Sequence, residues 1–126
     1  AARIHLAGFQ NHLALFYQAM DLLAVPSLYE GMSNVVLEAM ACGVPVLAHE
    51  ACGNAEMIRQ QEDGIIADLG TVGQLQIGLT NAAGRPAQLR RMGENAREKA
   101  VRDFSLVRMA ALSGNLYREL SKGNPD

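Results

Sequence analysis

The 126-residue sequence is poor in three features that mark particular classes of protein. Its two cysteines, Cys42 and Cys52, are too few for a disulfide framework and lack metal-site spacing, so we expect a reducing compartment. Its formal net charge of −2 argues against a nucleic-acid partner, because nucleic acids bind clustered Lys and Arg. No apolar run approaches the roughly 20 residues that cross a bilayer, and we find no signal-peptide pattern.

Two further absences concern ligands. The sequence has no Asp-x-Asp motif and no cluster of ligating histidines, so it predicts neither a metal nor a cofactor. Basic residues do gather in one stretch, but acidic residues are interleaved with them, which predicts a solvated helix face. The stretch contains Arg85, Arg90, Arg91, Glu94, Arg97, Glu98 and Lys99.

What is present predicts one α/β domain over residues 1–122, followed by a disordered tail at 123–126. The sequence is 49% hydrophobic, which is enough for a core. Short apolar strands alternate with helical patterns, and this order is typical of a Rossmann-like parallel sheet with flanking helices. Strands are predicted at residues 3–7, 22–25, 46–48 and 65–67, and helices at about 11–20, 34–42, 56–60, 71–81, 86–103 and 106–121. In the last helix, core packing is predicted for Leu106, Met109, Leu112, Leu116 and Leu120.

The chain is organised around residues 26–48. An apolar run ends at Pro26, and a loop containing Gly31 and Ser33 leads into a helical pattern. Ser33 can serve as the N-cap of this helix, which leaves its first amides without intrahelical partners. The sequence therefore predicts an anion site at the helix start, and a phosphate suits it.

The predicted helix has a polar and an apolar face. At about 100° per residue, Asn34 and Glu38 share the small-residue face, while Val36 and Met40 lie on the other. Glu30 precedes the helix, with seven residues between it and Glu38. Carboxylates beside an anion site are suited to binding hydroxyls.

This segment, PSLYEGMSNVVLEAMACGVPVLA, resembles the E-x7-E signature of retaining glycosyltransferases of family four, also called glycosyl transferases group 1, which have the GT-B fold. Flanking residues extend the resemblance over nearly the whole chain. Residues 4–8 and 15–21 resemble the lead-in of the family, in which a strand and a glycine are followed by a helix with a Tyr-x-x-x-Asp pattern. Gly53 and Glu56 resemble its G-x-x-E turn, and residues 63–66 resemble the strand that comes next. The resemblance implies a partial C-terminal, donor-binding domain.

The resemblance implies transfer of a sugar from a nucleotide-sugar, UDP- or GDP-linked, to an acceptor hydroxyl with the anomeric configuration retained. It implies that Glu38 binds the ribose and that Glu30 orients the donor sugar at the catalytic centre, although a covalent nucleophile is the alternative role for Glu30. The remaining donor-binding residues that it implies are Gly31, Met32, Ser33, Asn34 and Val35 at the helix start, and Gly8, Phe9 and Gln10 near the base.

By the same resemblance, an N-terminal domain absent from this chain would hold the glycan or glycolipid acceptor, and this fragment alone would be inactive. The expected role is bacterial surface polysaccharide or glycolipid synthesis, in the cytoplasm or peripherally at the inner membrane. Two alternatives stay open. The chain could be a non-catalytic nucleotide-binding subunit completed by another chain, or part of a GT-B-like nucleotide-sugar epimerase.

The family's first two strands of this domain are absent, so we expect residues 3–7 either to pair in a way foreign to the family or to leave a sheet edge through which the chain self-associates. His49 stands where the family usually has Thr. We expect it to be a surface loop residue, with a ligand contact as the alternative.

Overall fold

The computed structural model describes residues 4–29, 31–50 and 53–122, so the predicted tail at 123–126 lies outside the described residues. The elements follow one another as helices and strands in near alternation. In chain order they are α1 (Leu13–Gln18), β1 (Leu23–Val25), α2 (Asn34–Ala41), β2 (Val46–His49), α3 (Asn54–Met57), β3 (Ile65–Ala67), α4 (Val72–Ala83), α5 (Pro86–Asp103) and α6 (Leu106–Lys122).

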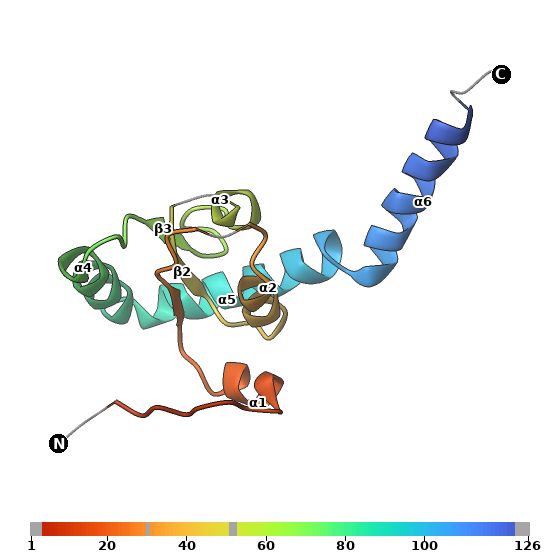
Figure 1. Cartoon of the computed structure of the whole chain (residues 1–126). Coiled ribbons are helices and arrows are strands. Elements are labelled where there is room, and N and C mark those ends of the chain that lie inside the picture. Colours follow the sequence, from red (N-terminus) through yellow and green to blue (C-terminus); the bar gives the residue numbers. More distant parts are fainter. Residues whose placement is uncertain (1–3, 30, 51–52, 123–126) are drawn as a thin grey trace.

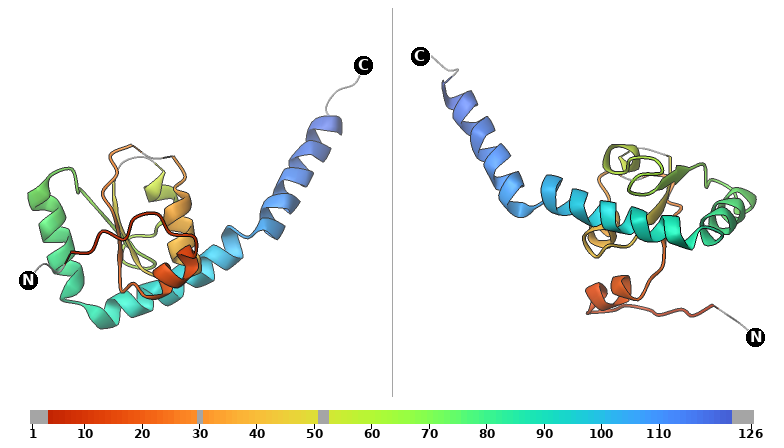
Figure 2. Two further views of the ribbon diagram at one scale, coloured as in Figure 1. Left: turned by 60° about the horizontal axis from the view of Figure 1, so that its bottom comes forward. Right: turned by 180° about the vertical axis from the view of Figure 1, so that it is seen from behind.

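The described strands form a parallel sheet in the order β1-β2-β3, which confirms the predicted fold class. All four residues of β2 are buried, because helices cover the sheet on both faces. Leu47 of β2 faces α4, while Val46 and Ala48 join a cluster with Val36 and Met40 of α2. Figures 1 and 2 show α4 on one side of the sheet and α2 with α3 on the other, with α5 running across one end.

The junction of α2 and α5 depends on two glycines. Gly43 follows the end of α2 with φ +77°, the left-handed C′ conformation that favours glycine. Gly93 of α5 lies directly against it, and a Cβ at Gly93 would approach the Gly43 carbonyl oxygen to well under 3.0 Å. The backbones therefore touch, and Ala96 and Ala100 continue the same buried face of α5.

A buried charge cluster joins α5 to the turn before β3. Asp63 is fully buried and accepts hydrogen bonds from the Arg59 backbone N–H at 2.6 Å and from its Nε at 2.7 Å. Lys99 is also buried, with Nζ 3.7 Å from Asp63 and donating to the Met57 carbonyl. The expected solvated face holds for the arginines of α5 but is wrong for Lys99.

The predicted first strand is absent from the described chain. Residues 4–7 form no strand, and Ile4, Leu6 and Phe9 are 80%, 96% and 91% exposed. An apolar run becomes a strand only when it has a neighbour to pair with, and this segment passes α1 without reaching β1 (Figure 2). The sheet thus has three described strands instead of four.

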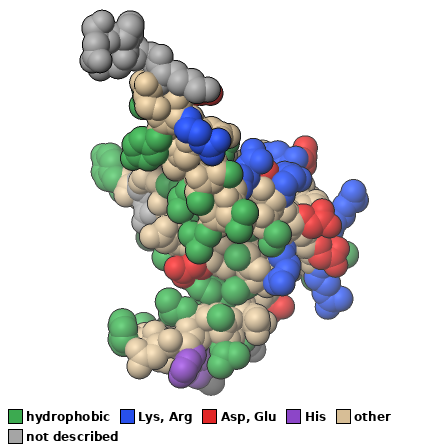
Figure 3. Space-filling model, turned by 90° about the vertical axis from the view of Figure 1, so that its right-hand side faces the viewer, with side chains coloured by type: hydrophobic (Ala, Val, Ile, Leu, Met, Phe, Trp, Pro, Cys, Tyr) green, Lys and Arg blue, Asp and Glu red, His purple; other side chains and the backbone are tan. Residues whose placement is uncertain are grey.

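Helix α6 is the second departure from expectation. The predicted core positions Leu106, Met109, Leu112, Leu116 and Leu120 are all more than half exposed. The helix extends away from the body of the molecule (Figure 1), because nothing in the described chain lies opposite its apolar stripe. Seen from the side toward which α6 extends, apolar side chains cover the centre of the surface and charged ones gather along one margin (Figure 3).

Among the described residues, no helix is long and apolar enough to cross a membrane.

The α2–α5 junction gives a first test. Gly93→Ala should destabilise the fold by about 1–3 kcal/mol, because the new methyl group collides with backbone that cannot move aside. Urea denaturation monitored by circular dichroism measures this loss. The matched control is Gly73→Ala in α4, where a Cβ would meet nothing within 4 Å. It should leave stability unchanged or raise it by up to about 1 kcal/mol. Equal effects of the two changes would contradict the close contact.

Candidate functional site

The loops after β1 and β2 meet at the carboxyl edge of the sheet. A Cβ at Gly53 would lie 2.5 Å from the Gly31 carbonyl oxygen, so the two loops pack backbone against backbone at this point. Only glycine permits that approach. In an open α/β sheet, the crevice outside the carboxyl ends of the strands is where ligands bind. The contact therefore shapes the place at which the sequence predicts a site.

The start of α2 lies beside this contact. Ser33 occupies the N-cap position with extended backbone, as predicted, but its side chain accepts no hydrogen bond from the first turn. Ser33 is buried, whereas Asn34 and Val35 are exposed. The helix thus begins without a side-chain cap, and its amides and its dipole face the crevice. Both features favour an anion at this position.

One side chain of α2 is held by α1. Glu38 is exposed on the polar face, and its Oε2 accepts a hydrogen bond of 2.9 Å from the Tyr17 hydroxyl. Tyr17 is only 6% exposed. Burial, followed by the hydrogen bond to Glu38 and the charge of that residue, raises the pKa of Tyr17 to about 12. Tyr17 lies in the predicted helix at 11–20, but the sequence did not indicate its pairing with Glu38, because residues 21 positions apart give no local signal.

The N-terminal loop and α1, together with Val35 of α2, line an open hollow of about 450 Å³. Gly8, Phe9, Gln10 and Val35, all predicted donor-binding residues, line it together with Tyr17 and neighbouring apolar side chains. Gly8 has φ +63°, a backbone conformation that other residues rarely adopt. The structure therefore brings this part of the predicted set together. Gly31 and Met32 are exposed in the loop beyond the hollow, and Glu30 lies outside the described residues.

His49 proves to be a strand residue. It ends β2 and is 9% exposed, so the expectation of a surface loop residue is wrong. Its Nδ1 accepts a hydrogen bond of 2.9 Å from the Leu69 backbone N–H, which leaves the ring proton on Nε2 in the neutral form. The Asn54 side chain donates to the His49 carbonyl at 3.2 Å. His49 thus connects the end of β2 to the segment that follows β3 and to the start of α3.

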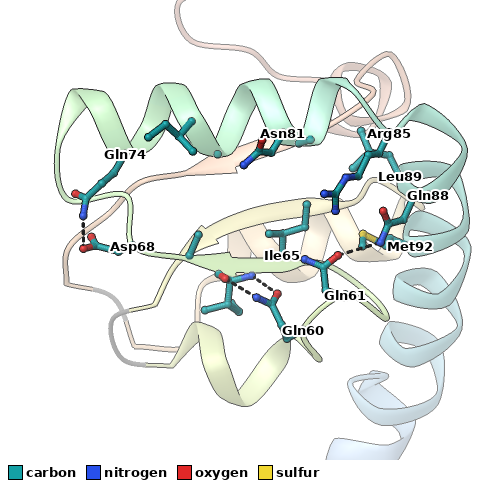
Figure 4. Close-up of a pocket in the computed structure, with 15 residues that line it drawn as sticks. Gln60, Gln61, Ile65, Asp68, Gln74, Asn81, Arg85, Gln88, Leu89 and Met92 are labelled. Carbon is teal, nitrogen blue, oxygen red and sulfur yellow. Dashed lines mark hydrogen bonds between the residues drawn. The ribbon is translucent and has the colours of Figure 1, made fainter.

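A second hollow, of about 390 Å³, lies between α4, β3 and α5, and none of the predicted site residues line it (Figure 4). Several of its polar side chains are already paired. Gln60 makes two hydrogen bonds to the backbone of Ile66, Gln88 bonds to Gln61, and Gln74 bonds to Asp68. The pair formed by Gln60 closes the outer margin of β3. Within the described ranges, no group of three or more His, Cys, Asp or Glu side chains is placed to hold a metal ion.

Comparison with known proteins assigns the family. The family described as Glycosyl transferases group 1 matches residues 1–99. The chain belongs to this family. Among the relatives of this group 1 chain is UDP-Gal:alpha-D-GlcNAc-diphosphoundecaprenol alpha-1,3-galactosyltransferase of Escherichia coli, 28% identical over 94% of this chain and 30% of the relative.

Solved structures place the group 1 domain in the GT-B fold. Sucrose-phosphate synthase from Thermosynechococcus elongatus has a TM-score of 0.82 and 33% identity, over 90% of this chain and 28% of that one. Anabaena HepE in complex with UDP and glucose has a TM-score of 0.81 and 26% identity, over 95% and 32%. The chain thus spans less than a third of the length of these proteins, as the prediction of a partial domain requires.

The Tyr17–Glu38 contact predicts how stability depends on pH. The fold favours the neutral phenol, since the pKa of Tyr17 rises from 10.0 to about 12. The neutral Tyr17 side chain therefore contributes its full stabilisation of the fold below pH 10, and this stabilisation is lost as the pH rises to about 12. The difference in free energy of unfolding between the native chain and Tyr17→Phe should shrink over this interval. A difference that stays constant up to pH 12 would contradict the assignment.

Proposed function

We propose that this chain is the donor-binding part of a retaining glycosyltransferase of family four, which transfers a sugar from a nucleotide-sugar to an acceptor hydroxyl. The observation that carries the proposal is the position of Glu38. It presents an exposed carboxylate one turn inside a helix whose uncapped start faces the crevice between two glycine loops. An acceptor for hydroxyls thus lies one turn from a site for an anion, which is the combination that a nucleoside diphosphate needs.

Each part of the donor then has a binding place. The base lies against the apolar hollow lined by Gly8, Phe9, Gln10 and Val35, and the ribose hydroxyls donate to Glu38. The diphosphate and sugar meet the backbone from Gly31 to Val35, including Met32, Ser33 and Asn34. Departure of the nucleoside diphosphate is the difficult step, because negative charge develops on it. Amides already oriented toward that charge stabilise it without reorganising.

Glu30 is the proposed catalytic residue. Its place in the E-x7-E pattern supports a role in which its carboxylate holds and orients hydroxyls of the donor sugar. In this scheme the nucleophile attacks from the face that the leaving group departs from, which retains the anomeric configuration. No metal or cofactor takes part in this scheme. The chain's own contribution is to bind the donor and stabilise its leaving group.

We further propose that the full-length protein works in the cytoplasm or at the inner surface of the bacterial inner membrane, on a surface polysaccharide or glycolipid. Support comes from the Escherichia coli relative, whose name specifies a UDP-linked donor and a diphosphoundecaprenol-linked acceptor. HepE was crystallised with UDP and glucose, which favours UDP over GDP as the carrier. An N-terminal domain outside this chain would bind the acceptor.

The proposal is tested by titrating UDP, GDP, ADP and CDP into the chain and following NMR shifts. One nucleotide should bind saturably. Glu38→Gln should weaken it about tenfold or more, because a hydrogen bond to a charged group contributes about 1.5–3 kcal/mol. The matched control is Glu94→Gln, which removes the charge of another exposed carboxylate, on α5, and should leave nucleotide binding unchanged.

Two results would contradict the proposal. Failure of all four nucleotides to bind would remove the donor site from this chain. Equal binding by the native chain and Glu38→Gln would leave a nucleotide site but refute the role of Glu38 in it.

A further inference from the structure

Tyr17 is the one residue of α1 that is buried; the other five residues of this helix are exposed. A buried tyrosine hydroxyl requires a hydrogen-bond partner, and the Oε2 of Glu38 supplies it at 2.9 Å. The ring itself belongs to the cluster that includes Val36 and Met40. The side chain is therefore fixed at both ends, by apolar packing around the ring and by Glu38 at the hydroxyl.

The fixed Tyr17 hydroxyl restricts the conformation of the Glu38 side chain. An exposed glutamate on a helix ordinarily samples several rotamers, and a ligand that binds it must fix one of them. The Tyr17 hydroxyl donates to Oε2 and thereby selects the rotamer before any ligand arrives. A carboxylate has about four acceptor positions on its two oxygens. Among the described residues, only the Tyr17 hydroxyl donates to this carboxylate, so the remaining positions, including both on Oε1, are open to a ligand.

We propose that Tyr17 is a positioning residue that orients the Glu38 carboxylate toward the two hydroxyls of a ribose, and that it thereby makes the site discriminate ribonucleotides from 2′-deoxyribonucleotides. This inference rests on the proposed function, because it assumes that Glu38 binds the ribose. Two neighbouring hydroxyls need acceptors in a defined direction, so they benefit from a fixed carboxylate. A single hydroxyl finds an acceptor on a mobile carboxylate more easily. Loss of the Tyr17 hydroxyl should therefore weaken the ribonucleotide more than its deoxy form.

The experiment compares each nucleoside diphosphate that binds, among UDP, GDP, ADP and CDP, with its 2′-deoxy counterpart by calorimetric titration. The native chain should prefer the ribonucleotide. Tyr17→Phe keeps the buried ring and should lower ribonucleotide affinity about threefold to tenfold while changing the deoxynucleotide less, so that the ratio of the two affinities narrows. Glu38→Gln should abolish the preference, and adding Tyr17→Phe to it should narrow the ratio no further.

The control variant is Tyr117→Phe, which removes the hydroxyl of an exposed tyrosine on α6 and should leave both affinities unchanged. Circular dichroism checks that Tyr17→Phe is folded at the titration temperature. A role limited to anchoring α1 would weaken both nucleotides equally and leave the ratio at its native value.

The outcomes separate the two proposals. In one outcome, Tyr17→Phe keeps the native ratio of ribonucleotide to deoxynucleotide affinity while Glu38→Gln loses the preference for the ribonucleotide. That result overturns the role of Tyr17 but leaves the proposed donor site intact. No ribonucleotide preference in the native chain overturns the ribose role of Glu38 and this inference with it. No binding of any nucleotide overturns the proposed function itself.

Discussion

The burial of β2 on both faces is the constraint on which the rest of the structure depends. Its four residues are covered by α4 on one side and α2 on the other, and its backbone pairs with β1 and β3. Because all three strands run in parallel, their carboxyl ends lie at one edge. The loops carrying Gly31 and Gly53 therefore meet there, beside His49 at the end of β2. The site is a consequence of strand direction.

Most of the fold could be predicted because its signals are local. Pro26, Gly43 and Pro86 mark boundaries through fixed or left-handed backbone geometry, and the structure places element ends at or beside each of them. The predictions were wrong where the structure of a segment depends on a neighbouring element that pairs with it or covers it. Residues 4–7 have the composition of a strand, but the described part of the chain offers them no neighbour to pair with. The stripe of α6 has helical spacing, yet spacing defines a face without supplying what covers it.

The site was predictable to the extent that its residues are close in sequence. Glu38 and the helix start at Ser33 belong to one contiguous motif, and the hollow brings Gly8, Phe9 and Gln10 to the same helix. Tyr17 and His49 were missed in their roles for the same reason. Each acts through a hydrogen bond to a residue about twenty positions away, Glu38 and Leu69 respectively. Periodicity and spacing contain no information on contacts of that range.

The Gln60 side chain makes the two edges of the sheet unequal in their ability to pair with a further strand. Its amide bonds to both backbone groups of Ile66, so a single side chain takes the place that a neighbouring strand would occupy beside β3. Another strand arriving at that margin would have to displace it. At the opposite margin, β1 has no such substitute among the described residues. The β3 edge of the sheet is thus blocked, whereas the β1 edge is free to pair. Any added strand would therefore lie next to β1, beside α1.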